Sequence, residues 1–226
     1  MYRISPSAIG MLLECPRCLW LHFREPLKRP QGPFPSLPGG LDETFKKYFD
    51  EHRASGALPP EIEGKISGKL FPDRGKLDVW RNNWKGLRAE FPEFGIELKG
   101  AIDELLVEDD GRVTPLDFKT RGYPLKEDTH VHYQHQIDLY ALLLSRNGME
   151  SSGKGYLLFF WPKSYALGAA QFVTELVKLE VSAEKGEEVL SRVAEIIKGD
   201  MPEAHSACVF CAYRGNGSSA GETLFS

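Results

Sequence analysis

The stretch GAIDELLVEDDGRVTPLDFKT, residues 100–120, decides the fold, because it reads as two β-strands joined by a tight turn. A three-residue loop at 109–111 places Gly111 where hairpin closure needs a positive φ angle. In this register Glu108 faces Arg112 across the two strands. Both faces of the hairpin carry apolar residues, which predicts strands that are covered on both sides.

The same register brings three ionisable side chains to one face of the sheet. Counting back from the turn sets Asp103 opposite Asp117, and the period of two puts Lys119 on their face. Two facing carboxylates destabilise a sheet unless a cation neutralises them. A divalent metal ion would do so, and the backbone carbonyl of Phe118 would add an oxygen ligand. The alternative interpretation is a hairpin with ordinary surface acids and a salt-bridged lysine.

These residue types suit the hydrolysis of a phosphodiester bond. The reaction needs an ionised water and a way to absorb charge on the phosphate, and metal ions held by carboxylates supply both. A lysine beside the metal can orient the water or help to deprotonate it. Downstream, Gln136 and Tyr140 share one helical face, from which they can position the lysine or hold a phosphate backbone. A core tyrosine with an incidental glutamine is the alternative.

Size and composition predict one sizeable core. The chain has 226 residues, of which 42% are hydrophobic and 27% are charged. We find no run of about 18 apolar residues that would predict a membrane span, and the N-terminus lacks a signal-peptide pattern. We therefore expect a cytoplasmic protein without membrane association. The net charge of −4 neither indicates nor excludes a nucleic-acid partner, because active-site carboxylates contribute to it.

Periodicity predicts the elements on either side of the hairpin. We expect helices at 5–23, 41–53, 128–146 and 183–197, with a proline- and glycine-rich loop at 24–40. We expect strands near Leu70 and Val79, at 95–108, 112–120 and 155–161, and an edge strand at 171–180. This order predicts an α/β fold with a mixed central β-sheet flanked by helices. Residues 1–214 would form a single domain, followed by a disordered tail at 215–226.

Four cysteines form two C-x-x-C pairs, which are Cys15 and Cys18, and Cys208 and Cys211. Because disulfides are disfavoured inside cells, this spacing indicates a metal site. Four thiolates suit either Zn²⁺ or an iron–sulfur cluster. Either would join the N-terminal segment, 1–24, to the C-terminal segment, 200–214, as a clasp.

Together the motifs resemble the PD-(D/E)xK nuclease superfamily, which has a restriction-endonuclease-like core. The likeness covers residues 95–145, through the motifs Gly-Ala-Ile-Asp103, Leu-Asp117-Phe-Lys119-Thr120 and Gln136-Ile-Asp-Leu-Tyr140. It is closest to the RecB-like branch, which includes the nuclease domains of RecB and AddB and the CRISPR-associated RecB-like exonucleases.

The resemblance implies a Mg²⁺- or Mn²⁺-dependent deoxyribonuclease. Asp103 and Asp117 would bind the metal, Lys119 would be catalytic, and Gln136 and Tyr140 would be the helix motif of the branch. Exonuclease-like cutting of single-stranded or end-exposed DNA is implied, together with a helicase or integrase partner.

Two departures from the branch leave alternatives open. Members usually place a metal-ligating histidine after a glycine on an early helix, whereas the stretch PGGLDET at 38–44 has none. We expect Asp42 to serve there as an oxygen ligand, or alternatively to cap the helix. Without that ligand, the chain would be a catalytically weak or inactive DNA-binding or assembly module.

The second departure concerns the cysteines. Some members carry a [4Fe–4S] cluster that joins both ends of the domain, with one cysteine early and three late. The resemblance favours this cluster, whereas the two-plus-two layout of this chain keeps Zn²⁺ as the alternative.

Overall fold

The computed structural model describes residues 1–25, 27–30, 32 and 36–217. In chain order the elements are β1 (Tyr2–Ile4), α1 (Pro6–Glu14), α2 (Pro16–Arg24), α3 (Ser36–Ser55), β2 (Lys69–Leu70), α4 (Arg74–Arg81), β3 (Leu87–Phe91), β4 (Ile96–Gly100), β5 (Glu104–Val107), β6 (Val113–Thr120), the 3₁₀ turn η1 (Thr129–Tyr133), α5 (Gln134–Arg146), β7 (Lys154–Ala166), β8 (Ala169–Glu180), α6 (Ala183–Lys198) and α7 (Val209–Gly217). None of the described helices is both long and apolar enough to cross a membrane.

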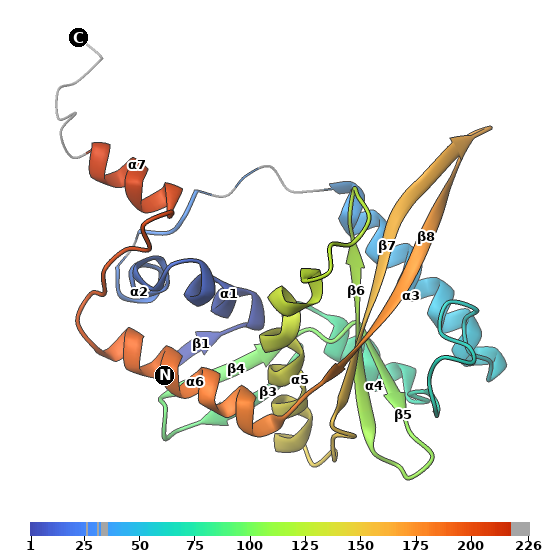
Figure 1. Cartoon of the computed structure of the whole chain (residues 1–226). Coiled ribbons are helices and arrows are strands. Elements are labelled where there is room, and N and C mark those ends of the chain that lie inside the picture. Colours follow the sequence, from blue (N-terminus) through green and yellow to red (C-terminus); the bar gives the residue numbers. More distant parts are fainter. Residues whose placement is uncertain (26, 31, 33–35, 218–226) are drawn as a thin grey trace.

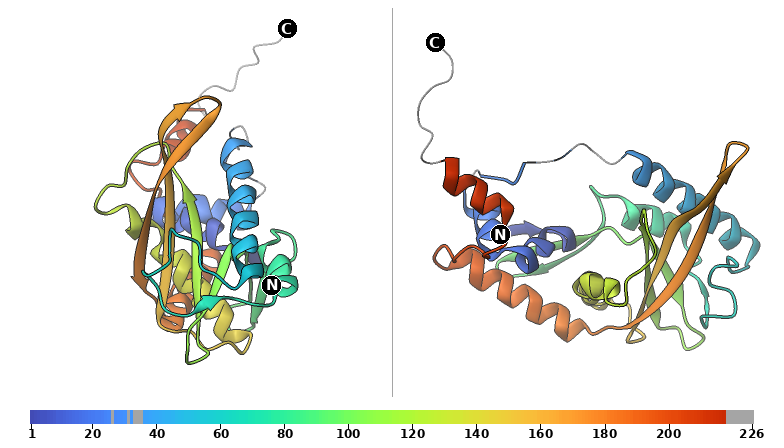
Figure 2. Two further views of the ribbon diagram at one scale, coloured as in Figure 1. Left: turned by 90° about the vertical axis from the view of Figure 1, so that its right-hand side faces the viewer. Right: turned by 45° about the horizontal axis from the view of Figure 1, so that its top comes forward.

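The strands form two sheets, with the order β1-β4-β3 in one and β2-β5-β6-β7-β8 in the other. Both sheets are mixed, because β1 runs parallel to β4 and β6 runs parallel to β7, while the other pairs are antiparallel. Helices α3 and α5 lie on the flanks of the larger sheet (Figures 1 and 2). The predicted α/β fold with helices around a mixed sheet is confirmed, although the strands divide between two sheets.

The predicted hairpin register is confirmed. Glu104 pairs with Leu116 and Val107 pairs with Val113, which is the register that sets Asp103 opposite Asp117. Gly111 closes the turn with a φ of 85°.

The prediction of one long strand at 95–108 is wrong, because the chain leaves one sheet and enters the other at 101–103. The Tyr140 hydroxyl donates to the Ala101 carbonyl at 2.7 Å. Ile102 N–H donates to the Trp80 carbonyl at 3.2 Å, and Arg81 Nε donates to the Asp103 carbonyl at 2.7 Å. These partners replace the hydrogen bonds of a continuous strand, so that β4 and β5 separate.

Two other predicted elements differ from the structure. The strand expected near Val79 is wrong, since that residue lies in α4, a helix capped where Asp73 accepts a hydrogen bond from Lys76 N–H at 2.9 Å. The helix expected at 5–23 is broken at Cys15, which is extended because Pro16 follows it.

Several boundaries also move. Helix α3 begins at Ser36, inside the predicted loop, and β7 and β8 are longer than predicted and project as a hairpin beyond the body (Figure 1). Helix α7 was not predicted, and its last residues, 215–217, overlap the tail expected to be disordered. The rest of that tail, 218–226, lies outside the described residues.

The packing of α5 connects the two sheets. This helix contacts β6 of the larger sheet and β3 and β4 of the smaller one. Its approach to β7 is close, because a Cβ atom at Gly155 would lie 2.2 Å from Ile137 Cγ2. A second apolar cluster fills the space between α3 and the larger sheet, where the rings of Phe45 and Phe160 stack at 3.8 Å. Between these two layers lies the site described next.

Candidate active site

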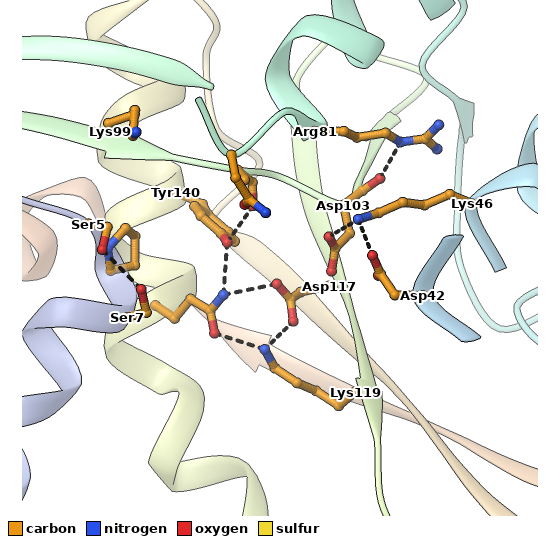
Figure 3. A pocket seen from close by; sticks show the side chains of 14 residues that line it. Ser5, Ser7, Asp42, Lys46, Arg81, Lys99, Asp103, Asp117, Lys119 and Tyr140 are labelled. Carbon is orange, nitrogen blue, oxygen red and sulfur yellow. Dashed lines mark hydrogen bonds and ion pairs between the residues drawn. The ribbon is translucent and has the colours of Figure 1, made fainter. Parts of the chain in front are cut away.

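A cavity of about 330 Å³ lies where α3, α5, β6 and the 101–103 bend meet (Figure 3). It brings together every side chain predicted to act in catalysis or metal binding, which are Asp42, Asp103, Asp117, Lys119, Gln136 and Tyr140. Further lining residues, absent from the sequence prediction, include Ser5, Lys46, Arg81 and Lys99. Phe118 lies in β6 between two of the predicted residues, and its carbonyl stays a predicted ligand.

Asp117 is a deeply buried carboxylate, with 2% of its surface exposed. Burial raises its pKa to about 7, although Lys119 opposes the rise and the charge of Asp103 adds to it. Asp117 Oδ2 is 2.5 Å from Lys119 Nζ. Within the described part of the chain, this oxygen has no hydrogen-bond donor beyond that ion pair. Because burial opposes the ionised form of Asp117 even beside Lys119, a bound cation would stabilise that form further.

A directed chain of hydrogen bonds positions Lys119. Its Nζ donates to Gln136 Oε1 at 2.9 Å, and Gln136 Nε2 donates to Asp117 Oδ1 at 3.0 Å and to the Tyr140 hydroxyl at 2.8 Å. Tyr140 in turn donates to the Ala101 carbonyl. The amide of Gln136 therefore has its acceptor and donor roles assigned by its neighbours.

Lys119 carries a positive charge in this environment. Burial would lower its pKa, but the Asp117 carboxylate outweighs burial and raises the pKa above its usual value. The ammonium also lies 4.6 Å from the ring centre of Tyr133, a cation–π contact. A charged lysine can stabilise negative charge and orient water, whereas action as a base requires that it first lose a proton.

Asp103 is held in the bend by contacts on both its backbone and its carboxylate. Oδ2 accepts a hydrogen bond from Phe118 N–H at 3.1 Å. The β5–β6 pairing starts only at Glu104 and Leu116, so no residue of β5 pairs with Phe118. Oδ1 lies 2.8 Å from Lys46 Nζ. The backbone carbonyl accepts from Arg81, as described above. These contacts turn the carboxylate toward the cavity that Asp117 also lines.

Lys46 is the functional residue that the sequence reading missed. It lies one turn after Asp42 on α3, and its Nζ is 2.7 Å from Asp42 Oδ2, so that it bridges Asp42 and Asp103. Burial and the charge of Asp103 raise the pKa of Asp42, against the pull of Lys46. Burial would lower the pKa of Lys46, but Asp103 and Asp42 raise it. The four-residue spacing of Asp42 and Lys46, which places both on one face of a helix, was the sequence pattern that could have predicted their ion pair.

A buried ionic network lies behind Asp103. Glu104 is fully buried, and its Oε2 lies 2.5 Å from Arg53 and 3.0 Å from Arg81. Arg81 also lies 2.9 Å from Asp50 Oδ1. Burial raises the pKa of Glu104, and the two arginines counteract that rise. Removal of one partner would leave a buried charge unpaired, so this network rigidifies the backbone on which Asp103 sits.

The donor set of the cavity fits Mg²⁺ or Mn²⁺. It offers the carboxylates of Asp42, Asp103 and Asp117, and hard divalent cations prefer oxygen ligands. Asp117 Oδ2 is a buried oxygen whose partner among the described residues is the ammonium of Lys119. The ammonium of Lys46 lies between the carboxylates of Asp42 and Asp103, so it competes with a metal ion for their oxygens.

The four cysteines form a second site, at the junction of α1, α2 and α7. The Sγ–Sγ distances are 3.8 Å for Cys15–Cys211, 3.6 Å for Cys18–Cys208 and 3.6 Å for Cys18–Cys211. All four sulfurs lie within 4.8 Å of one another. The site can therefore hold a metal, and it ties residue 15 to residue 211.

The electrostatics of this second site also favour a cation. Burial and the neighbouring cysteines raise the pKa of Cys211 to about 12. Burial would also raise the pKa of Cys208, but hydrogen bonds from Cys211, Cys18 and Cys15 lower it to about 7. Four adjacent thiolates repel one another, and a bound cation would offset that repulsion. His205 N–H donates to Cys15 Sγ at 3.4 Å. The guanidinium of Arg29, which stacks on Phe210 at 4.5 Å, lowers the pKa of Cys18, although burial raises it overall.

Comparison with known proteins gives one family. A family model described as the PD-(D/E)XK nuclease superfamily matches residues 40–215, which is most of the chain. No curated protein matches the sequence. A solved structure described as "Crystal structure of SSO0001" is 15% identical over 94% of this chain and 84% of that chain, with a TM-score of 0.47. A likeness this distant carries no argument, so the family assignment rests on the family model.

Proposed function

Because the chain belongs to the PD-(D/E)XK nuclease superfamily, we propose that it hydrolyses DNA phosphodiester bonds with Mg²⁺ or Mn²⁺. The single observation that carries this proposal is the hydrogen-bonded set of Asp117, Lys119 and Gln136 beside Asp103 in one cavity. We further propose the RecB-like branch and an exonuclease-like reaction on single-stranded or end-exposed DNA. A helicase or integrase partner and a cytoplasmic location belong to the same proposal.

Each residue has a separate role. Asp103 and Asp117 would hold the metal, with Asp42 and the Phe118 carbonyl as further ligands. When bound, a divalent cation supplies charge neutralisation at the phosphate and a lower pKa for water. Lys119 orients the attacking water and stabilises the negative charge that develops on the phosphate.

The helix motif acts through Lys119. Gln136 accepts a hydrogen bond from the ammonium of Lys119 and donates to Asp117, so it fixes the distance between a cation and a metal ligand. Tyr140 anchors Gln136 to the 101–103 bend. We therefore assign Gln136 and Tyr140 as positioning residues.

A catalytically weak or inactive DNA-binding module is the second candidate. Lys46 favours it, because an ammonium group already bridges Asp42 and Asp103. Binding of DNA without cleavage in any divalent metal would select this candidate over the first.

A nuclease assay tests the proposal. The purified chain should degrade linear single-stranded DNA in Mg²⁺ or Mn²⁺, and Lys119→Ala should lose about a hundred-fold or more of that activity. The matched control is Lys178→Ala, which removes an exposed lysine from β8. Circular single-stranded DNA should resist cutting by an exonuclease. Equal activity of the wild type and Lys119→Ala would contradict the assignment.

For the second site we propose a single Zn²⁺ held by Cys15, Cys18, Cys208 and Cys211. A tetrahedron with Zn–S bonds of about 2.3 Å has edges of about 3.8 Å, close to three of the sulfur–sulfur distances, 3.6–3.8 Å, and the remaining pairs lie within 4.8 Å. In a [4Fe–4S] cluster each thiolate binds a different iron, which holds the sulfurs well beyond van der Waals contact. The spacing therefore supports zinc, the alternative to the cluster that the family resemblance favours.

A further inference from the structure

A second cavity opens beside the catalytic one. It also has a volume of about 330 Å³, and it shares Ser5 and Lys99 with the first cavity. Figure 3 shows both shared residues on one side of the catalytic cavity. The neighbouring residues Asn83 and Trp84 divide between the two, Asn83 lining the first and Trp84 the second. The two cavities therefore adjoin each other at Ser5 and Lys99.

Trp84 presents an exposed indole at the second cavity. Its surface is 84% exposed, which is unusual for the largest apolar side chain of the genetic code. An indole left in water gains no hydrophobic stabilisation. A ligand or partner that covers the ring would supply it.

The turn that carries Trp84 is held firmly by hydrogen bonds. Asn82 Oδ1 accepts from the N–H groups of Trp84 at 2.8 Å and Lys85 at 2.9 Å. Arg88 donates to the carbonyls of Trp84 and Lys85. Gly86 N–H donates to the Val79 carbonyl at 3.2 Å. A fixed turn lowers the entropic cost of binding a ligand on the indole.

The floor of the second cavity is positively charged. Arg88 stands opposite Lys99 across β3 and β4, a like-charged pair that destabilises a sheet. Glu97 is shared between Arg3 at 3.2 Å and Arg88 at 3.1 Å. Among the described residues no ion pair involves Lys99. One carboxylate thus faces three cations, which leaves a net positive charge for an anionic ligand.

We propose that this second cavity binds an unpaired nucleotide of a single-stranded nucleic acid, with its base stacked on Trp84 and its phosphates beside Lys99 and Arg3. The inference rests on the proposed function, because the cavity that Trp84 lines adjoins the catalytic cavity at Lys99. An aromatic platform with flanking cations suits single strands of any sequence, since every base has a π-face. A base-paired nucleotide inside a duplex is stacked on both neighbours and cannot offer that face to Trp84.

Equilibrium binding tests the site without requiring cleavage. Fluorescein-labelled oligothymidylate, oligouridylate and a blunt DNA duplex are titrated with the full chain in Ca²⁺ in place of Mg²⁺. Trp84→Ala should weaken single-strand binding by roughly ten-fold or more, and Trp84→Phe should retain most of it. Duplex binding should change little in either variant. The DNA and RNA arms identify which single strand the site prefers.

The matched control is Tyr213→Ala, which removes an equally exposed aromatic from α7, and it should bind like the wild type. Lys99→Ala should reduce the slope of log affinity against log salt by about 0.7, the value for one single-strand phosphate contact.

Two outcomes separate this inference from the proposed function. Unchanged single-strand affinity in Trp84→Ala, with cleavage intact in the wild type, would overturn the stacking site alone and assign the indole to a different partner. A wild type that neither binds nor cleaves nucleic acid would overturn both. Because Trp84 is exposed, its variants should melt like the wild type, so a folding defect will not imitate the expected loss.

Discussion

The positive charge of Lys46 acts directly on the proposed metal site. Its ammonium lies within 3 Å of Asp42 and Asp103, two of the carboxylates proposed to bind metal. A cation there lowers the affinity for a second cation by Coulomb repulsion, while it also keeps the carboxylates from repelling each other. Whether the site binds its metal tightly depends on how far this side chain can move aside.

Substitution of Lys46 tests that balance. Lys46→Gln should tighten Mn²⁺ binding by about ten-fold, because it removes one positive charge from the ligands. Isothermal titration calorimetry measures the affinity directly, without reference to activity. Lys47→Gln on the same helix is the matched control, since Lys47 points away from the cavity and lines a different surface. Weaker Mn²⁺ binding in Lys46→Gln would instead make Lys46 part of the scaffold that orders the carboxylates.

Metal binding should also depend on pH through Asp117. Its pKa is raised to about 7, so below that pH the folded protein holds a proton that Mn²⁺ must displace. We expect Mn²⁺ affinity to rise from pH 6 to about 8 and then to level off. Calorimetry in buffers of different ionisation enthalpy should count about one proton released at pH 6 and fewer at pH 8.

The same shift has a consequence for stability. A carboxyl whose folded-state pKa lies above its unfolded value binds more protons when folded, so the metal-free protein should lose stability as pH rises from about 4 to 7. Bound metal should remove that loss. An Mn²⁺ affinity independent of pH between 6 and 8 would show that Asp117 is ionised throughout that range.

At the scale of elements, the break between β4 and β5 decides the geometry of the site. A continuous strand would place Asp103 within the β5–β6 ladder, where its backbone groups would be used in pairing. In the structure, Arg81 of α4 donates to the Asp103 carbonyl instead, and Tyr140 of α5 donates to the carbonyl of Ala101. The carboxylate then turns over the end of β5 and accepts a hydrogen bond from Phe118.

Helix α5 is the element that joins the layers. Gln136 and Tyr140 face the cavity from one side of the helix. On another side, Gly155 of β7 lets Ile137 pack closely against that strand. Gly186 of α6 allows similar contact with the backbone of Asp138. Close packing on two sides limits the rotation of α5, and this keeps Gln136 within hydrogen-bond distance of Lys119.

At the scale of the whole molecule, the cysteine site closes the chain. It connects the α1–α2 junction to α7, and α2 also donates hydrogen bonds from Arg17 to Pro202 and from Trp20 to Gly199, in the segment that joins α6 to α7. Because α1 begins beside the catalytic cavity with Ser5 and Ser7, loosening the clasp would also disturb that cavity. The division into one domain at 1–214 stays a prediction, and these contacts support it.

Removal of the metal should therefore destabilise the protein. Elemental analysis should find one zinc for each chain and no iron. Treatment with a zinc chelator, or the variant Cys211→Ser, should lower the free energy of unfolding by more than about 2 kcal/mol. Ser206→Ala in the same segment is the control and should melt like the wild type. Iron with sulfide, and a broad visible absorption, would contradict zinc and restore the cluster.

Local patterns predicted the hairpin register well. Gly111 marks the turn, and the period of two carries the pairing from Glu108 and Arg112 back to Asp103 and Asp117. The helical face of Gln136 and Tyr140 was equally accessible, because a spacing of four residues needs no knowledge of the fold. The catalytic roles of these residues stay predictions, although the structure brings their side chains into one cavity.

Other features could not be predicted, because they depend on partners distant in the sequence. Lys46 meets Asp103 only after α3 packs against the larger sheet. The segment around Val79, expected to be a strand, is a helix because Asp73 caps it and Leu77 is buried in the core. A short apolar run in the sequence reveals neither feature. The exposure of Trp84 beside the second cavity is likewise decided by the tertiary structure.

The sequence by itself determined the hairpin, the shared faces of the acidic, basic and amide side chains, and the pairing of four cysteines, because these follow from short-range sterics and periodicity. Only the tertiary structure decided where the first hairpin strand breaks, which cation lies between Asp42 and Asp103, and how closely the sulfurs approach. Buried backbone and charged groups pair with partners that the packing of distant segments brings near them. A local sequence pattern does not predict those partners.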